Sequence, residues 1–188
     1  MKTLALFDFD GTLYKKDSLL EFTKFSKGNV TFFKGMLALL PWLIGLKVGI
    51  LHNEKAKKKF ITHFFKDMNL EEFAAVSKEF ALQKIEENLH PILFQKLKNH
   101  VKANHTIYIV TASFQEWIAP WSSKFNIEVI GTKIEIKNEK LTGGFASKNC
   151  FGMEKVNRIK EVLNLNDFDI IHVYGSGKGD REMLQLSK

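Results

Sequence analysis

The sequence contains one cysteine and only two arginines among its 188 residues. The single cysteine, Cys150, excludes a disulfide within the chain and is typical of a reducing compartment. The first apolar run, at residues 3–9, resembles a strand rather than a signal peptide, so we expect a cytoplasmic protein. The chain has a net charge of +7, and nearly all of its positive charges are lysines. Proteins that bind nucleic acids favour arginine, which makes bidentate contacts with bases and phosphates. We therefore expect no nucleic-acid partner.

The sequence also lacks an apolar run long enough to predict a membrane-spanning helix. The longest, GMLALLPWLIGLKVGIL (35–51), is shorter than the roughly 20 residues that a span needs, and Pro41 lies inside it. The pattern favours a pair of buried helices broken at Pro41. The alternative is a patch of 35–51 that contacts a membrane surface, since lysines attract anionic lipids. Four lysines follow the run, at Lys55, Lys57, Lys58 and Lys59.

The chain is 45% hydrophobic, which is enough apolar material for a core. Four short apolar runs predict buried strands, at 3–9, 106–111, 127–132 and 168–175. Helical patterns separate the strands, so we predict an α/β fold with a parallel sheet and helices on both faces. The alternating stretch KIEIKNEKLTGGF (133–145) predicts a small β-hairpin that turns near Asn138 and Glu139.

Residues 18–103 have an almost wholly helical pattern and form an insertion after the first strand. Ser18 followed by Glu21 predicts a capping box at the start of its first helix. Beyond the insertion, Ser113 is expected to cap a helix over 114–125, and a further helix is expected around 153–163.

Polar residues follow several of the predicted strands, where a parallel sheet binds its ligands. Asp8 and Asp10 end the first strand, Thr111 ends the second, and the stretch 173–184 ends the fourth and leads into a final helix. Lys155 opens the helix that leads toward the fourth strand. We expect these groups to converge at one edge of the sheet, with the helical insertion covering it.

The glycine-rich loop GSGKG (175–179) resembles a nucleotide-binding loop only superficially. A Walker A loop requires Ser or Thr after Gly-Lys and another glycine five residues before. Here Gly179 follows Lys178, and His172 stands at the earlier position. The loop therefore has to be interpreted with the rest of the chain.

The stretch FDFDGTL (7–13) places two carboxylates close together if the chain bends at Gly11 and Thr12. Carboxylates that share a site repel each other unless a cation neutralises them. Magnesium suits such a site, because it takes few carboxylates together with a substrate phosphate. A carboxylate can also attack phosphorus and form an aspartyl-phosphate. The alternative is an ordinary acidic turn after a strand.

Four motifs together resemble the haloacid dehalogenase (HAD) superfamily of phosphohydrolases. They are FDFDGTL (7–13), Thr111 of VTAS, Lys155 of FGMEK and VYGSGKGDREML (173–184). The helical insertion between the first two motifs is similar to that of the phosphoserine-phosphatase-like branch. The resemblance implies a Rossmann-like core of residues 1–17 and 104–188, a helical cap of residues 18–103, a Mg²⁺ cofactor and hydrolysis of phosphate monoesters.

The resemblance also implies roles for the motif residues. Asp8 would be the nucleophile, and Asp10 the general acid and then the base that activates water. Thr111, Ala112 and Lys155 would bind the phosphoryl oxygens. Magnesium would bridge the Asp8 carboxylate, the Asp10 backbone carbonyl and the phosphate.

The fourth motif departs from the family pattern G-D-x-x-x-D, because Ser176 stands where the first acid belongs. Asp180 retains the second acid. A hydroxyl is a poorer magnesium ligand than a carboxylate. We predict either direct ligation of Mg²⁺ by Asp180 or weak binding through water, with Ser176 in the surrounding shell. A structural role for Asp180 as a cap of the last helix is the alternative.

Asp17 stands near the position where phosphoserine phosphatases place an acid that meets the substrate amine. Its alternative role is to cap the helix that begins at Ser18. The insertion 18–103 contains no arginine to bind a substrate carboxylate, which argues against phosphoserine as the substrate.

These features predict a Mg²⁺-dependent phosphomonoester hydrolase that works through an aspartyl-phosphate on Asp8. The substrate is expected to be a small phosphate ester or, because 35–51 is similar to the cap of phosphatidylglycerophosphatase C-like members, a lipid phosphate. The rival hypotheses are a non-catalytic binder of phospho-ligands and a phosphotransferase. Relatives usually continue further after the fourth motif, so we expect either a short sheet edge or a missing final element. The oligomeric state is left open.

Overall fold

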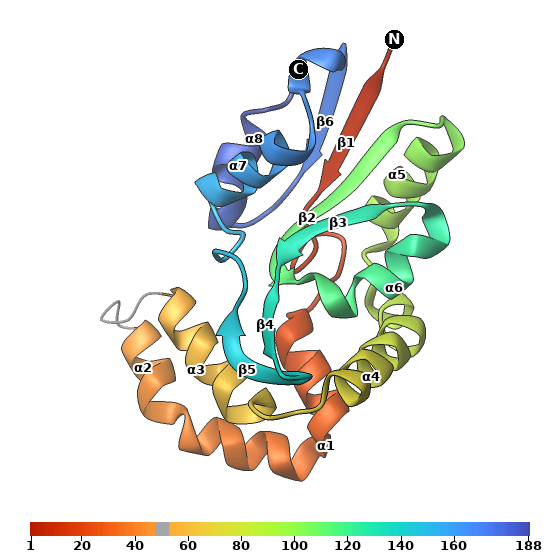
Figure 1. The fold of residues 1–188 in the computed structure, drawn as a ribbon. Coiled ribbons are helices and arrows are strands. Elements are labelled where there is room, and N and C mark those ends of the chain that lie inside the picture. Colours follow the sequence, from red (N-terminus) through yellow and green to blue (C-terminus); the bar gives the residue numbers. More distant parts are fainter. Residues whose placement is uncertain (48–52) are drawn as a thin grey trace.

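The computed structural model describes residues 1–47 and 53–188 and is built on a four-stranded parallel sheet (Figure 1). The strand order is β3-β2-β1-β6, and each pair of neighbours is parallel. The strands are β1 (Thr3–Phe7), β2 (Thr106–Phe114), β3 (Glu128–Thr132) and β6 (Ile170–Tyr174). The predicted α/β fold with its four parallel strands is confirmed.

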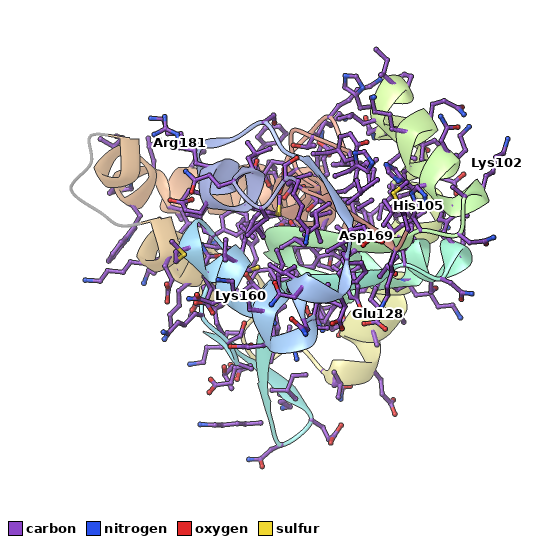
Figure 2. The ribbon with its side chains drawn as sticks, turned by 90° about the horizontal axis from the view of Figure 1, so that it is seen from above. Lys102, His105, Glu128, Lys160, Asp169 and Arg181 are labelled. Atoms are coloured by element: carbon purple, nitrogen blue, oxygen red, sulfur yellow. The ribbon has the colours of Figure 1, made fainter. Side chains whose placement is uncertain are left out.

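The sheet is covered on both faces because alternate residues of β1 point to opposite sides. Ala5 and Phe7 pack in a core with α5 (Pro91–Lys102) and α6 (Ala119–Ser122). Leu4 and Leu6 pack in a second core with α7 (Met153–Val162) and α8 (Arg181–Leu184). Figure 2 shows α5 and α7, marked by Lys102 and Lys160, on opposite sides of the strands.

Four helices of the insertion lie beyond the carboxyl ends of the strands, while both termini lie at the other end (Figure 1). They are α1 (Ser18–Ala38), α2 (Leu40–Lys47), α3 (Asn53–Phe65) and α4 (Leu70–Gln83). The 3₁₀ turn η1 (Glu86–Asn88) then leads into α5. The insertion is thus placed to cover the edge of the sheet where ligands bind.

The predicted hairpin is formed by β4 (Ile134–Lys137) and β5 (Lys140–Phe145), which pair antiparallel. Its turn residues Asn138 and Glu139 both have positive φ, at 49° and 57°. The hairpin packs on α3, where a Cβ on Gly143 would lie 2.7 Å from Cα of Thr62. The hairpin, which follows β3 in the chain, therefore packs against the inserted helices at α3.

The division into a core of 1–17 and 104–188 and a cap of 18–103 stays a prediction. Within the second range, α5 packs on the sheet. Its His100 Nε2 lies 3.0 Å from the Tyr174 hydroxyl on β6, and its Leu97 is fully buried in the sheet core.

The predicted capping box at Ser18 is wrong, and Asp17 caps α1 instead. The Asp17 Oδ1 accepts a hydrogen bond of 3.1 Å from the backbone N–H of Leu20. The Ser18 hydroxyl is buried and lies 2.7 Å from Ser113 Oγ, while it also accepts from the indole N–H of Trp117. The Ser18 hydroxyl is therefore engaged by Ser113 and Trp117 in the core and does not cap the helix. The capping role of Asp17 is confirmed.

The predicted helix over 114–125 is also wrong. β2 continues to Phe114, so Ser113 lies in the strand and caps nothing. The segment consists of η2 (Gln115–Trp117), α6 and η3 (Ser123–Phe125). Pro120 has no backbone N–H and is tolerated only in a first helical turn, which explains why a new short helix begins beside it.

The buried helix pair expected at 35–51 is contradicted for the residues that the structure describes. The break falls at Leu39, and Pro41 is the second residue of α2. Leu37, Leu40 and Trp42 are exposed to 70%, 48% and 40%. Residues 48–51 of the predicted patch lie outside the described part of the chain. Across the ranges that are described, no helix combines the length and the apolar character that a membrane span requires.

Candidate active site

The site begins at the turn that follows β1. The backbone N–H of Asp8 donates to the Tyr174 carbonyl of β6 at 2.8 Å, which fixes Asp8 at the end of the sheet. Gly11 then takes a positive φ of 75°, a conformation that glycine adopts without strain. Its N–H donates to the Tyr14 carbonyl at 2.7 Å, so the chain folds back on itself within this segment. The bend predicted at Gly11 and Thr12 brings Asp8 and Asp10 to the same end of the sheet.

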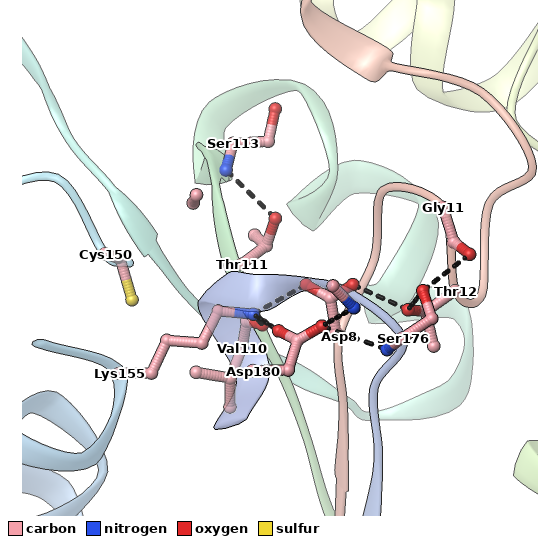
Figure 3. Close-up of polar contacts among 12 residues, drawn as sticks. Asp8, Gly11, Thr12, Val110, Thr111, Ser113, Cys150, Lys155, Ser176 and Asp180 are labelled. Atoms are coloured by element: carbon pink, nitrogen blue, oxygen red, sulfur yellow. Dashed lines mark hydrogen bonds and ion pairs between the residues drawn. The ribbon is translucent and has the colours of Figure 1, made fainter. Parts of the chain in front are cut away.

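A buried lysine connects two carboxylates at this turn (Figure 3). The Lys155 Nζ donates to Oδ1 of Asp8 and to Oδ1 of Asp180, both at 2.6 Å. Its third hydrogen bond, of 2.8 Å, goes to the Val110 carbonyl of β2. The side chain is 1% exposed, so all three donors of the ammonium group are satisfied away from solvent. The sequence-predicted Asp8, Lys155 and Asp180 are thus brought into direct contact.

Burial and charge act on this triad in opposite directions. Burial alone lowers the pKa of Lys155, but the attraction of Asp8 and Asp180 outweighs it and raises that pKa above its ordinary value. Burial raises the pKa of Asp8, although the neighbouring ammonium opposes this effect. A lysine that stays charged is therefore available beside a carboxylate that has little contact with water.

The second oxygen of Asp8 faces two hydroxyl groups. Thr12 Oγ1 donates to Asp8 Oδ2 at 2.7 Å and lies 3.0 Å from Ser176 Oγ. Ser176 Oγ donates to the Gly11 carbonyl at 3.0 Å. Ser176 therefore contacts Asp8 only through Thr12, a residue that the sequence analysis did not single out although it belongs to the first motif.

Asp180 holds the loop after β6. Its Oδ2 accepts hydrogen bonds from the N–H groups of Ser176, at 3.0 Å, and Gly177, at 2.8 Å. Asp180 stands at the N-cap position of α8 but makes no side-chain cap bond to that helix. Its side chain instead forms the capping-box bond to Gly177 in the 3₁₀ turn η5 (Lys178–Asp180) that leads into α8, so the structural alternative is borne out in part. Both Asp180 oxygens are occupied by Lys155 and the loop, and direct ligation of a metal would have to replace one of these contacts.

Asp10 lies apart from the triad and faces the inserted helices. Its Oδ1 accepts a hydrogen bond of 2.9 Å from the backbone N–H of Ser18. Burial, with a smaller contribution from the charge of Asp17, raises the pKa of Asp10 to about 7. A carboxyl group with this pKa can both give and take a proton near neutral pH.

Thr111 and Ala112 lie at the end of β2, next to the Val110 carbonyl that accepts from Lys155 (Figure 3). Thr111 Oγ1 is buried and accepts from the N–H of Ser113 at 3.0 Å. The Ala112 carbonyl accepts from Thr132 Oγ1 at 2.7 Å. The register of β2 against β3 shifts after Thr111, so this end of the strand is irregular where the predicted phosphate-binding residues stand.

A cavity of about 400 Å³ lies between this end of the sheet and the inserted helices. Asp10 and Asp17 line one part of it, with Ala112 and Ser113 from β2. α1 and α3 supply most of its apolar wall, through Leu19, Leu20, Met36, Ala56 and Phe60. Asp17, whose carboxylate caps α1, therefore also faces the cavity.

Lys57 of α3 is the cavity residue that the sequence analysis missed. Its Nζ donates to the Ala112 carbonyl and, at 3.1 Å, to Oδ1 of Asn149. It also lies 4.3 Å from the centre of the Phe114 ring, a cation–π contact. Burial lowers the pKa of Lys57 to about 8, with Asp10 and Asp17 partly opposing the shift. Lys57 precedes the buried Ile61 by four residues, and this helical spacing could have separated it from its lysine neighbours.

We expect Lys57→Met to stabilise the fold at pH 7 by about 1–3 kcal/mol, since the variant no longer buries a charge that its surroundings disfavour. The Ala112 carbonyl keeps its hydrogen bond of 2.7 Å from the Thr132 hydroxyl. Between pH 8 and 10.5 the unfolded chain holds the Lys57 proton and the folded chain has lost it, so native stability rises through this range. Denaturant unfolding at pH 7 and pH 10 should therefore show the advantage of Lys57→Met shrinking at the higher pH. A constant difference would contradict the unfavourable burial of this charge.

The fold and the site define an α/β protein that carries a buried carboxylate, Asp8, at the end of its first strand, in contact with a buried lysine. Residues 5–185 match the family of haloacid dehalogenase-like hydrolases, and the chain belongs to this family. It is 31% identical over 186 residues to protein CicA of Caulobacter vibrioides, covering 98% of this chain and 82% of CicA.

Two solved structures have a similar fold. A protein of unknown function from Bordetella pertussis Tohama I superposes with a TM-score of 0.83 at 23% identity, covering 100% of this chain and 87% of that one. A substrate-bound phosphoserine phosphatase superposes with a TM-score of 0.66 at 16% identity, covering 100% and 83%. The predicted superfamily, its phosphoserine-phosphatase-like fold and a hydrolytic enzyme are confirmed.

Proposed function

We propose that this chain is a Mg²⁺-dependent phosphomonoester hydrolase that works through an aspartyl-phosphate on Asp8. The observation that carries the proposal is the buried Asp8 carboxylate, held by Lys155 at 2.6 Å where β1 ends, near a cavity lined by Asp10. Solved relatives with the same fold include phosphoserine phosphatase, whose substrate is a phosphate monoester. The cytoplasmic location stays a prediction.

In the first step, an Asp8 oxygen attacks phosphorus and the bond from phosphorus to the ester oxygen breaks. Asp10, with a pKa of about 7, gives its proton to the leaving oxygen. Asp10 then takes a proton from water, which attacks phosphorus and breaks the bond to Asp8. Inorganic phosphate leaves, and Asp8 is a free carboxylate again.

Lys155, Thr111 and Ala112 are proposed to hold the phosphoryl oxygens during both steps. The Lys155 ammonium already lies 2.6 Å from Asp8, and binding a phosphoryl oxygen would replace one of its three present hydrogen bonds. Thr111 offers a hydroxyl and Ala112 a backbone N–H at the end of the neighbouring strand. The buried position of Thr111 and Lys155 keeps water from competing for these contacts.

The donor set fits a magnesium ion that is held by few protein ligands. Magnesium commonly takes one or two carboxylates and fills its remaining positions with water and substrate phosphate. Asp8 and the Asp10 backbone carbonyl would hold it, with Ser176 and Asp180 acting through water. When bound, Mg²⁺ would neutralise charge between Asp8 and the phosphoryl group. Among the described residues, no three His, Cys, Asp or Glu side chains are grouped as metal ligands, which is consistent with weak binding.

The test is phosphate release from an aryl phosphate at increasing MgCl₂, for the native chain and for Ser176→Asp. We expect release that EDTA abolishes, and a Mg²⁺ requirement lowered about tenfold or more by the added carboxylate. Calorimetric titration with Mg²⁺ alone should show the same order of affinities without any turnover. Ser123→Asp, an exposed position outside the site, controls for the added charge.

Unchanged Mg²⁺ affinity in Ser176→Asp would contradict the weak-metal proposal, whereas absence of turnover in both chains would favour the rival hypothesis of a phospho-ligand binder. Transfer of phosphate to an added alcohol would identify a phosphotransferase.

The cavity also bears on the class of substrate. Its wall is apolar apart from Asp10, Asp17, Lys57 and Asn149, together with the polar atoms of Ala112 and Ser113. We propose a small phosphate ester or a lipid phosphate whose apolar part contacts Leu20, Met36 and Phe60. Comparison of kcat/KM for an alkyl phosphate and for phosphoserine tests this, and a preference for phosphoserine would overturn it.

A further inference from the structure

The second half of α1 and the following α2 expose large apolar side chains that no element of the described chain covers. Gly28, with φ 75° and ψ 162°, kinks α1. Beyond the kink, one side of the helix packs inward, where Gly35 lies so close to α3 that a Cβ would collide with the Phe64 ring. The exposed residues are Val30, Phe33 and Leu37 of α1 with Leu40, Trp42 and Ile44 of α2, here called the α1–α2 face.

The α1–α2 face lies at the end of the molecule that is remote from both termini (Figure 1). The side chains of Phe33 and Leu37 are exposed to 58% and 70%. A single exposed leucine is common on protein surfaces and needs no explanation, but a group of such residues is not. Six such side chains on two adjoining helices form a patch of the kind that marks an interaction surface.

Lysines predominate around this patch, although the exposed Glu54 stands in the first turn of α3. The sequence contains no Asp or Glu from residue 22 to residue 53, while it contains Lys24, Lys27, Lys34 and Lys47. The lysines at 34, 55, 58 and 59 are exposed. Lys59 Nζ lies 5.1 Å from the centre of the Trp42 ring, so a cation and an aromatic ring adjoin at the edge of the face.

We propose that the α1–α2 face docks on the surface of an anionic lipid bilayer. Apolar side chains bordered by lysines and a tryptophan suit the boundary between headgroups and acyl chains. Each lysine near the surface adds attraction to anionic lipids. A second copy of the chain is a poorer occupant, because two such faces would bring lysines of the same charge together.

Docking would place the cavity close to the bilayer. Met36 of α1 and Ala56 and Phe60 of α3 line the cavity, and these helices also carry the face and its lysines. A substrate with an acyl or alkyl chain could therefore reach the apolar wall from the lipid side. The docking itself goes beyond the proposed reaction and does not depend on it.

The experiment is flotation of the full chain with vesicles of phosphatidylcholine alone or mixed equally with phosphatidylglycerol. We expect the native chain to float with the anionic vesicles, less so at high salt, because screening weakens the lysine contribution. Phe33→Glu/Leu37→Glu should lose binding by about tenfold or more, since it places charge where the face enters the lipid. Ile92→Glu/Val162→Glu adds the same charge at positions exposed to 66% and 52% outside the face, and should bind like the native chain.

Phosphate release from a soluble aryl phosphate should be the same in the native chain and in Phe33→Glu/Leu37→Glu, because neither residue lines the cavity. This readout separates a failure of docking from a failure of the proposed reaction. The proposal is overturned if the folded native chain ignores anionic vesicles, or if both double variants lose binding equally. It is also overturned if light scattering shows a dimer that only Phe33→Glu/Leu37→Glu dissociates, since the occupant is then a second copy.

Discussion

Asp8→Asn is expected to reduce phosphate release by at least about 10³-fold, to the background of the assay. The amide has the shape of the carboxylate but is too weak a nucleophile to attack phosphorus. The fold should persist, because Lys155 keeps its partner Asp180 at 2.6 Å and the Val110 carbonyl at 2.8 Å. The measurement is release of phosphate from an aryl phosphate in saturating Mg²⁺, with circular dichroism to verify folding.

Asp17→Asn is the matched control for this experiment. It removes a carboxylate that lines the cavity beside the site, and asparagine is as good a helix cap as aspartate, so α1 should be retained. We expect it to keep most of the turnover. A rate that is equal in the native chain and in Asp8→Asn would contradict the role of Asp8 and would indicate a contaminating phosphatase.

Much of this site could be predicted from the sequence, because the geometry of a parallel sheet determines which loops come together. Short apolar runs identify buried strands, and parallel strands bring their carboxyl ends to one edge. The residues just after those runs must then meet, which is why Asp8 and Asp180 lie near each other and share a contact with Lys155. Lys155 itself opens a helix, and the resemblance to the family motif predicted its role. Ser176 stood out in the same way, as a departure from a motif.

The exposure of 35–51 and the position of Lys57 depend on tertiary packing, which the hydrophobic periodicity of the sequence does not indicate. The run at 35–51 is apolar on all sides, so its pattern gives no contrast between a buried and an exposed face. Only the position of α3, which covers Gly35 and leaves Leu37 free, decides between them. Lys57 was hard to identify for a similar reason, because it sits among other lysines and only its spacing to the buried Ile61 distinguishes it in the sequence.

The capping of α1 shows the same limit at a single residue. Both Asp17 and Ser18 are good caps, and the sequence favoured Ser18 through Glu21. Tertiary contacts reversed the choice, since Ser113 and Trp117 bind the Ser18 hydroxyl. Local patterns thus rank alternatives, and long-range hydrogen bonds select among them.

Lys155→Met is expected to destabilise the fold by about 3–5 kcal/mol, the usual cost of removing one partner from a buried ion pair. Asp8 and Asp180 would remain buried without their shared cation. The pKa of Asp8, which Lys155 holds down, would rise further, so the folded variant would bind protons more tightly than the unfolded one. Its deficit relative to the native chain should therefore grow as the pH rises from 5 to 8, which denaturant unfolding at both pH values measures.

Lys57→Met is the matched control, because the same substitution of another buried lysine is expected to stabilise the fold, whereas Lys155→Met is expected to destabilise it. Lys57 has no carboxylate in hydrogen-bond contact, and its surroundings lower its pKa, whereas two carboxylates raise that of Lys155. Adding Asp180→Asn to Lys155→Met should recover part of the lost stability, since one uncompensated carboxylate disappears. If both lysine variants change stability alike, or if Asp180→Asn recovers nothing, the triad is held by packing rather than by charge.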